Sequence, residues 1–241
     1  MPALPIEPLL PALGQALRDA GRAVLQAPPG AGKTTRVPLY LLDAGLVEGR
    51  ILLLEPRRVA ARAAAERLAA GLGEAVGRSV GYRMRGDSVA GARIEVVTEG
   101  VLTRMLQAAP DLPGVGCVIF DEFHERALQG DLGLALALEA RAALRPELLL
   151  LVMSATLDAA PVAALMGDAP VLTAEGRAWP VDTRWLETPP PPAARLEAAA
   201  ADLVLHALAE TEGGVLVFLP GQAEIARTAA RLAPRLPPDK R

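Results

Sequence analysis

Short apolar runs alternate with longer Ala-, Leu- and Arg-rich stretches along most of the chain, and this alternation limits the possible folds most strongly. The apolar runs predict buried strands at residues 24–25, 51–54, 94–97, 118–120 and 148–153. The stretches between them predict helices at residues 34–42, 59–72, 101–107 and 132–144. This rhythm predicts an α/β fold with a parallel sheet, helices on both faces and right-handed crossovers.

Composition agrees with that fold. The chain has 241 residues, of which 51% are hydrophobic and only 3% aromatic, so its core must be aliphatic, as suits strands buried on both faces. The net charge of -3 shows no overall basic field. A local basic face is still possible, because nearly all the positive charge is arginine and the only lysines are Lys33 and Lys240.

One of those lysines stands in a glycine-rich loop. Residues 27–34 read Ala-Pro-Pro-Gly-Ala-Gly-Lys-Thr and connect an expected strand to an expected helix. Glycines let successive backbone N–H groups turn toward phosphate oxygens, and the helix N-terminus adds its positive dipole end. We therefore expect Lys33 to reach the β- and γ-phosphates of a nucleotide and Thr34 to ligate Mg²⁺. Ala27 departs from the usual leading glycine, and an ordinary glycine-rich turn is the alternative.

Two acids follow the apolar run at 118–120. Carboxylates at the end of a buried parallel strand are expected to stand over a ligand bound at the carboxyl edge of the sheet. We expect Asp121 to hold Mg²⁺ through water and Glu122 to position and polarise an attacking water. The alternative is a solvated turn formed by Asp121, Glu122 and Glu125.

Six segments stand in an order that resembles the DEAH/DExH helicases of superfamily 2. They are Gly-Ala-Gly-Lys-Thr-Thr (30–35), Pro-Arg-Arg (56–58), Thr-Glu-Gly (98–100), Asp-Glu-Phe-His-Glu-Arg (121–126), Ser-Ala-Thr (154–156) and Phe-Leu-Pro-Gly (218–221). The resemblance covers nearly the whole chain. It implies a RecA-like P-loop NTPase that uses ATP and Mg²⁺ and couples hydrolysis to movement on, or unwinding of, a nucleic-acid strand. The implied partner is single-stranded nucleic acid, with RNA favoured over DNA.

The resemblance also implies roles for particular residues. Nucleotide binding would involve Gly30, Ala31, Gly32, Lys33, Thr34, Thr35 and Arg67, the last by stacking on the base. Catalysis would involve Lys33, Asp121, Glu122 and His124, with Thr34 and Asp121 at the metal. Nucleic-acid contacts would come from Arg57, Arg58, Arg85 and Thr98, and Ser154 and Thr156 would couple hydrolysis to domain movement. His124 matches the position that links the acidic segment to the second domain.

From the residues alone these roles are less defined. Arg57 and Arg58 follow a strand and begin a helix, so phosphate contacts and a solvated helix start are equally good interpretations. Ser154 and Thr156 could simply cap the helix expected to follow at Asp158. Arg67 would be a helix-surface residue, and Thr98 a hydroxyl at a strand end.

The domain organisation is predicted in three parts. Residues 1–176 would form a first RecA-like domain, with a polar turn at 86–91, and residues 177–195 a connecting segment with four prolines at 189–192. Residues 196–241 would begin a second RecA-like domain, with helices at 196–209 and 222–232 around a strand at 215–219. Because the second domain is incomplete, we expect a truncated chain without the arginine finger, weak nucleotide binding and negligible turnover.

Other classes of protein fit less well. A P-loop kinase would need an acceptor pocket and a transport ATPase a signature loop, and neither is visible; a non-hydrolytic switch is disfavoured by Glu122. We expect no membrane partner, because no signal peptide or membrane span is apparent. Cys117, the single cysteine, excludes a disulfide within the chain, and a cytoplasmic location is expected.

Overall fold

The computed structural model describes residues 4–155, 159–175, 180–186, 188 and 195–236. The chain divides into two compact units, Met1–Ala178 and Trp179–Arg241. The predicted domain boundaries at 176 and 195 remain predictions.

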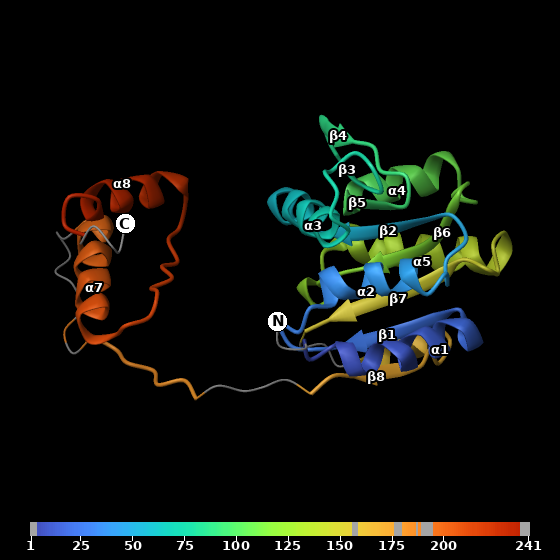
Figure 1. Cartoon of the computed structure of the whole chain (residues 1–241), viewed down its shortest axis with the longest axis horizontal. Coiled ribbons are helices and arrows are strands. Elements are labelled where there is room, and N and C mark those ends of the chain that lie inside the picture. Colours follow the sequence, from blue (N-terminus) through green and yellow to red (C-terminus); the bar gives the residue numbers. More distant parts are fainter. Residues whose placement is uncertain (1–3, 156–158, 176–179, 187, 189–194, 237–241) are drawn as a thin grey trace. The chain divides into compact units, whose positions relative to one another are not determined.

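The first unit is built on an eight-stranded sheet with the order β4-β3-β5-β2-β6-β7-β1-β8 (Figure 1). The strands are β1 (Arg22–Gln26), β2 (Arg50–Glu55), β3 (Val80–Met84), β4 (Asp87–Val89), β5 (Ile94–Thr98), β6 (Val115–Phe120), β7 (Leu149–Ser154) and β8 (Val171–Thr173). Every neighbouring pair is parallel except β3 and β4. The predicted α/β fold is therefore confirmed.

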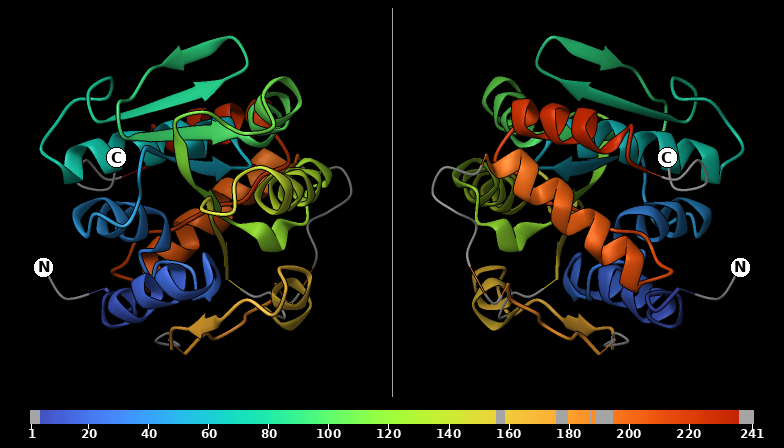
Figure 2. Two further views of the ribbon diagram at one scale, coloured as in Figure 1. Left: turned by 90° about the vertical axis from the view of Figure 1, so that its right-hand side faces the viewer. Right: turned by 90° about the vertical axis from the view of Figure 1, so that its left-hand side faces the viewer.

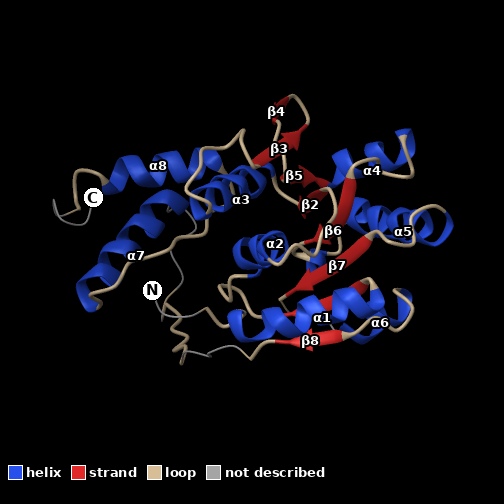
Figure 3. Ribbon diagram, turned by 45° about the vertical axis from the view of Figure 1, so that its right-hand side comes forward, coloured by secondary structure: helices blue, strands red, loops and turns tan. Residues whose placement is uncertain are grey.

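Helices cover both faces of this sheet (Figure 3). One face carries α1 (Leu10–Ala20), α2 (Lys33–Asp43) and α3 (Arg58–Gly71), and the other carries α4 (Glu99–Ala108), α5 (Leu128–Ala143) and α6 (Ala159–Leu165). Two short 3-10 helices, η1 (Glu7–Leu9) and η2 (Phe123–Glu125), complete the unit. Along β2, Ile51 and Leu53 pack into the first apolar layer and Leu52 and Leu54 into the second, as a strand buried on both faces requires.

Two strands at the ends of the sheet differ from the sequence prediction. The polar turn expected at 86–91 contains β4, which pairs antiparallel with β3. Gly86 adopts a φ of 76° and reverses the chain, so a hairpin forms where a loop was expected. Figure 2 shows this hairpin at one end of the sheet and β8 at the other. β8 was not predicted, because three residues with exposed Val171 give no strand pattern.

The second unit contains α7 (Leu196–Glu210) and α8 (Gln222–Leu232), which confirms both predicted helices. The strand predicted at 215–219 is wrong: this segment forms no strand and pairs with no other strand among the described residues. A strand is stabilised by hydrogen bonds to a neighbour. Without one, the apolar side chains of Leu216 and Phe218 stay 80% and 87% exposed.

The parallel strands of the first unit bring the predicted site to one edge. The glycine-rich loop follows β1, Glu55 ends β2, Thr98 ends β5 and Asp121 follows β6. The carboxyl ends of parallel strands lie on the same side of a sheet, where α/β proteins bind ligands.

Candidate active site

The loop between β1 and α2 has a backbone that needs glycine at two positions. Gly30 and Gly32 have φ values of 77° and 95°, in the left-handed region. A Cβ on Gly32 would lie 2.7 Å from Cδ1 of Leu4, whereas one on Gly30 would meet no atom within 4 Å. The amide of Ala27 donates to the carbonyl of Ser154 at 3.0 Å, so the end of β7 anchors the start of the loop.

Lys33 begins α2 and is almost buried, with 4% of its surface exposed. Its Nζ donates to the carbonyl oxygens of Ala27 at 2.7 Å and Pro28 at 3.3 Å. The ammonium is thus held over the loop by weak, uncharged acceptors. A phosphate oxygen that enters the loop would be a stronger, charged acceptor for the same group.

Thr34 and Asp121 meet, although they lie 87 residues apart in the sequence. The Thr34 hydroxyl donates to Asp121 Oδ2 at 2.5 Å, and the Glu122 amide donates to Oδ1 at 2.8 Å. Asp121 is 5% exposed, and burial raises its pKa, an effect that these hydrogen bonds oppose. The last residue of the glycine-rich loop, Thr34, therefore contacts Asp121 directly, as a shared site requires.

The donor atoms of this pair fit Mg²⁺. That ion takes hard oxygen ligands, usually one or two from protein and the rest from water and phosphates. Thr34 supplies a hydroxyl and Asp121 a carboxylate at the end of the phosphate loop. Within the described ranges, no group of three or more His, Cys, Asp or Glu side chains is placed to hold a metal by itself.

Glu122 and His124 stand in the loop that follows Asp121. Glu122 has a φ of 49°, and its Oε2 lies 3.4 Å from Nδ1 of His124. The same Nδ1 accepts a hydrogen bond from the Ala155 amide at 3.3 Å. A ring nitrogen that accepts a hydrogen bond carries no proton. With the Ala155 bond in place the contact with Glu122 is therefore not an ion pair, since an ion pair requires the protonated ring. His124 thus links the acidic loop to the segment after β7.

Glu55 is a site residue that the sequence analysis did not identify. It ends β2, is 4% exposed, and lies near Asp121 and Glu122. Burial, followed by the charges of these two acids, raises the pKa of Glu55 to about 8. The signal was present, since an acid directly after the apolar run 51–54 matches the arrangement used to identify Asp121.

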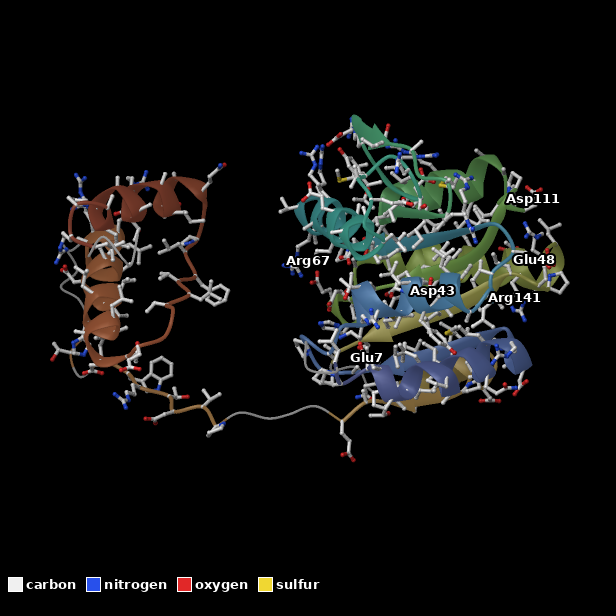
Figure 4. The ribbon with its side chains drawn as sticks, in the orientation of Figure 1. Glu7, Asp43, Glu48, Arg67, Asp111 and Arg141 are labelled. Atoms are coloured by element: carbon white, nitrogen blue, oxygen red, sulfur yellow. The ribbon has the colours of Figure 1, made fainter. Side chains whose placement is uncertain are left out.

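A pocket of about 330 Å³ joins these groups to α3. Its polar lining comes from Thr34, Thr35, Glu55, Arg57, Arg67, Glu122 and Glu125. Figure 4 shows Arg67 at the edge where the strands end, whereas Glu48, Asp111 and Arg141 lie at the opposite edge. The pocket therefore places Arg67 in the same hollow as Thr34 and Thr35, at the start of α2.

The residues expected to contact nucleic acid do not share one pocket. Arg57 lines the pocket just described, while Arg58 lines a neighbouring hollow on α3. Arg85 follows β3 and faces a groove shared with α4. Thr98 is the N-cap of α4 and pairs in register with Glu55. These residues are spread along the carboxyl side of the sheet.

The segment expected to couple hydrolysis to movement is only partly described. Ser154 ends β7, is fully buried, and accepts the Ala27 amide through its carbonyl. Thr156 and Asp158 lie outside the described residues.

Comparison with known proteins identifies the class. A family model described as "DEAD/DEAH box helicase" matches residues 11–165. The chain belongs to the DEAD/DEAH box helicase family.

Its similarity to particular relatives is also high. The chain is 50% identical to ATP-dependent RNA helicase HrpB of Escherichia coli strain K12, over 99% of this chain and 30% of that protein. A crystal structure of E. coli DEAH/RHA helicase HrpB matches with a TM-score of 0.90 and 50% identity, over 98% of this chain and 30% of the other. A crystal structure of E. coli DExH-box NTPase HrpB matches with a TM-score of 0.78 and 49% identity, over 99% of this chain and 30% of the other.

The chain thus spans about a third of the length of these relatives. Among the residues that the structure describes, no helix is both long and apolar enough to cross a membrane.

Proposed function

We propose that the protein carrying this chain is an ATP-dependent nucleic-acid helicase. One observation supports this most directly: the hydroxyl after the loop lysine contacts a buried carboxylate from a separate strand, at 2.5 Å. Lys33, Thr34, Asp121 and Glu122 thereby lie around a single position at the edge of the sheet. Family membership agrees with this function.

In the proposed reaction, Lys33 leaves the carbonyls of Ala27 and Pro28 and binds the β- and γ-phosphates. Thr34 and Asp121 would hold Mg²⁺, which when bound neutralises charge on the phosphates. Glu122 orients and polarises the attacking water, and His124 holds its loop against Ala155. Arg67 stacks on the base from the α3 side of the pocket.

The proposed partner is a single nucleic-acid strand, RNA rather than DNA, because the relative at 50% identity is named as an RNA helicase. Arg57, Arg58, Arg85 and Thr98 would contact its backbone, and Ser154 and Thr156 would couple hydrolysis to domain movement. Binding through phosphates makes affinity strongly salt-dependent. Since Cys117 is a buried free thiol, we propose the cytoplasm as the compartment.

The test is strand-stimulated ATPase of the full-length natural protein with matched RNA and DNA strands. We expect RNA to stimulate turnover, and Glu122→Gln to remove turnover by at least about a hundredfold while nucleotide binding persists, because a general base contributes about 10²–10⁴. ATPase that ignores both strands, or that survives Glu122→Gln, would refute the proposal. The 241-residue chain alone is expected to bind nucleotide weakly and turn it over negligibly.

A further inference from the structure

An ion pair joins the two loops that the proposed function assigns to different ligands. Nη2 of Arg57 lies 2.6 Å from Oε1 of Glu125. Arg57 is the N-cap of α3 and follows β2, whereas Glu125 ends η2 in the loop after β6. The side chains are 72% and 31% exposed, so the pair stands at the rim of the pocket and not in the core.

The pair is suited to exchange of partners. A guanidinium binds carboxylate and phosphate through the same planar fork of N–H donors. An exposed ion pair is weak, so a phosphate can displace the carboxylate easily. Glu125 lies in the same loop as Glu122, and its amide donates to the carbonyl oxygen of Glu122 at 2.9 Å.

Arg58 offers an internal comparison. It is next in sequence, is also exposed to solvent, and lines a different hollow, together with other residues of α3. In the described part of the chain it forms no ion pair, so its charge is balanced by solvent ions in the free protein. Arg57 and Arg58 therefore differ in their partner before any strand binds.

We propose that Arg57 exchanges Glu125 for a phosphate of the bound strand, so that strand occupancy releases Glu125 and loosens the loop that carries Glu122. This inference rests on the proposed function. It makes Glu125 an internal substitute for the strand phosphate and gives the strand a route to the hydrolytic site within one domain.

The exchange predicts a particular dependence of strand affinity on salt. A phosphate that is neutralised by a free arginine releases its counterion, which contributes about 0.7 to the slope of log affinity against log salt for a single strand. When Arg57 binds a phosphate, the strand releases one cation. The Glu125 carboxylate, which has lost its partner, takes up a cation in its place. Arg57 should therefore contribute nothing to the slope while its partner is present.

The experiment measures this slope by titrating a fluorescent single strand into the full-length protein over a range of salt concentrations. Arg58→Gln should reduce the slope by about 0.7, and Arg57→Gln should leave it unchanged although it weakens binding. Glu125→Gln should steepen the slope by about 0.7 and tighten binding by about two- to fivefold, the equivalent of one exposed ion pair. Glu66→Gln, an exposed acid on α3, controls for the loss of a negative charge.

The outcomes separate this inference from the function on which it rests. If Arg57→Gln reduces the slope as Arg58→Gln does, and Glu125→Gln leaves it unchanged, partner exchange is overturned while strand binding stands. If the unmodified protein binds no strand, the proposed function fails. The link to hydrolysis predicts that Glu125→Gln lowers the ratio of strand-stimulated to basal ATPase; an unaltered ratio overturns that link.

Discussion

The buried carboxyl group of Glu55, at the end of β2, is expected to make the stability of the first unit depend on pH. Glu55 is surrounded by Asp121 and Glu122, and its pKa is about 8 against an ordinary value of 4.5. The folded protein therefore binds this proton more tightly than the unfolded chain. Linkage then makes the stability contribution complete below about pH 4.5, and it is lost as the pH rises toward 8.

The size of the effect follows from the difference between the two pKa values. At about 1.4 kcal/mol for each pKa unit, the difference corresponds to at most about 5 kcal/mol. Glu55 shares its environment with Asp121, so one proton relieves both acids and we expect about 1–3 kcal/mol. Glu55→Gln cannot ionise. Its free energy of unfolding should equal that of the unsubstituted protein near pH 5 and exceed it by about 1–3 kcal/mol near pH 8.5.

The assay is thermal unfolding at both pH values, with a chelator present so that no divalent ion binds Asp121. For a unit of this size, each kcal/mol corresponds to about 2–4 °C in Tm. Glu95→Gln is the matched control, because Glu95 is 1% exposed but lies between Arg50 at 3.1 Å and Arg83 at 2.8 Å. Glu95→Gln should lower the free energy of unfolding by about 1–3 kcal/mol at both pH values. This is less than the cost of breaking a fully buried ion pair, because both arginines are partly solvated. Parallel pH profiles for the natural protein and Glu55→Gln would refute the reasoning.

Two further changes test the loop and the pocket. Gly32→Ala should cost about 1–3 kcal/mol and weaken nucleotide binding, because a φ of 95° strains any residue with a Cβ and the added Cβ would also displace Cδ1 of Leu4. Gly30→Ala, with a φ of 77° and open space around its Cβ, should cost about 1 kcal/mol, and thermal unfolding with and without nucleotide compares the two. Arg67→Ala should weaken nucleotide binding by about three- to thirtyfold with an unchanged Tm, since Arg67 is exposed and its proposed role is to stack on the base. A fluorescent nucleotide titration measures the loss, and equal affinity would exclude the stacking role.

The strands that sequence predicted are those buried on both faces. β1, β2, β5, β6 and β7 are central or near-central strands, whose continuous apolar runs carry a clear signal. β3 was missed because Gly81 and Arg83 interrupt its apolar residues, and it stands beside the hairpin at one end of the sheet. End strands need fewer apolar residues, so their sequences resemble loops.

The phosphate loop and acids were predictable for a different reason. Their positions depend on local rules, namely glycine before a helix and acids directly after a buried strand, and the parallel sheet brings them together without further information. The contact between Arg57 and Glu125 depends on the conformations of two loops whose paired residues lie 68 positions apart in the sequence. No spacing or periodicity in the sequence encodes such a pair.

The backbone of the acidic loop shows how the surrounding residues hold Glu122 in place. Glu122 and Arg126 have φ values of 49° and 50°, a left-handed conformation that costs about 1–3 kcal/mol at each non-glycine position. Arg126 is held by both carboxylate oxygens of Asp131, at 2.9 and 3.3 Å, and lies 6.0 Å from the ring centre of Phe123. Phe123 is itself buried edge-to-face against Phe120, the last residue of β6. The strain at the two ends of η2 is therefore offset by the contacts of Phe123 and Arg126, which hold the backbone of the loop that carries Glu122.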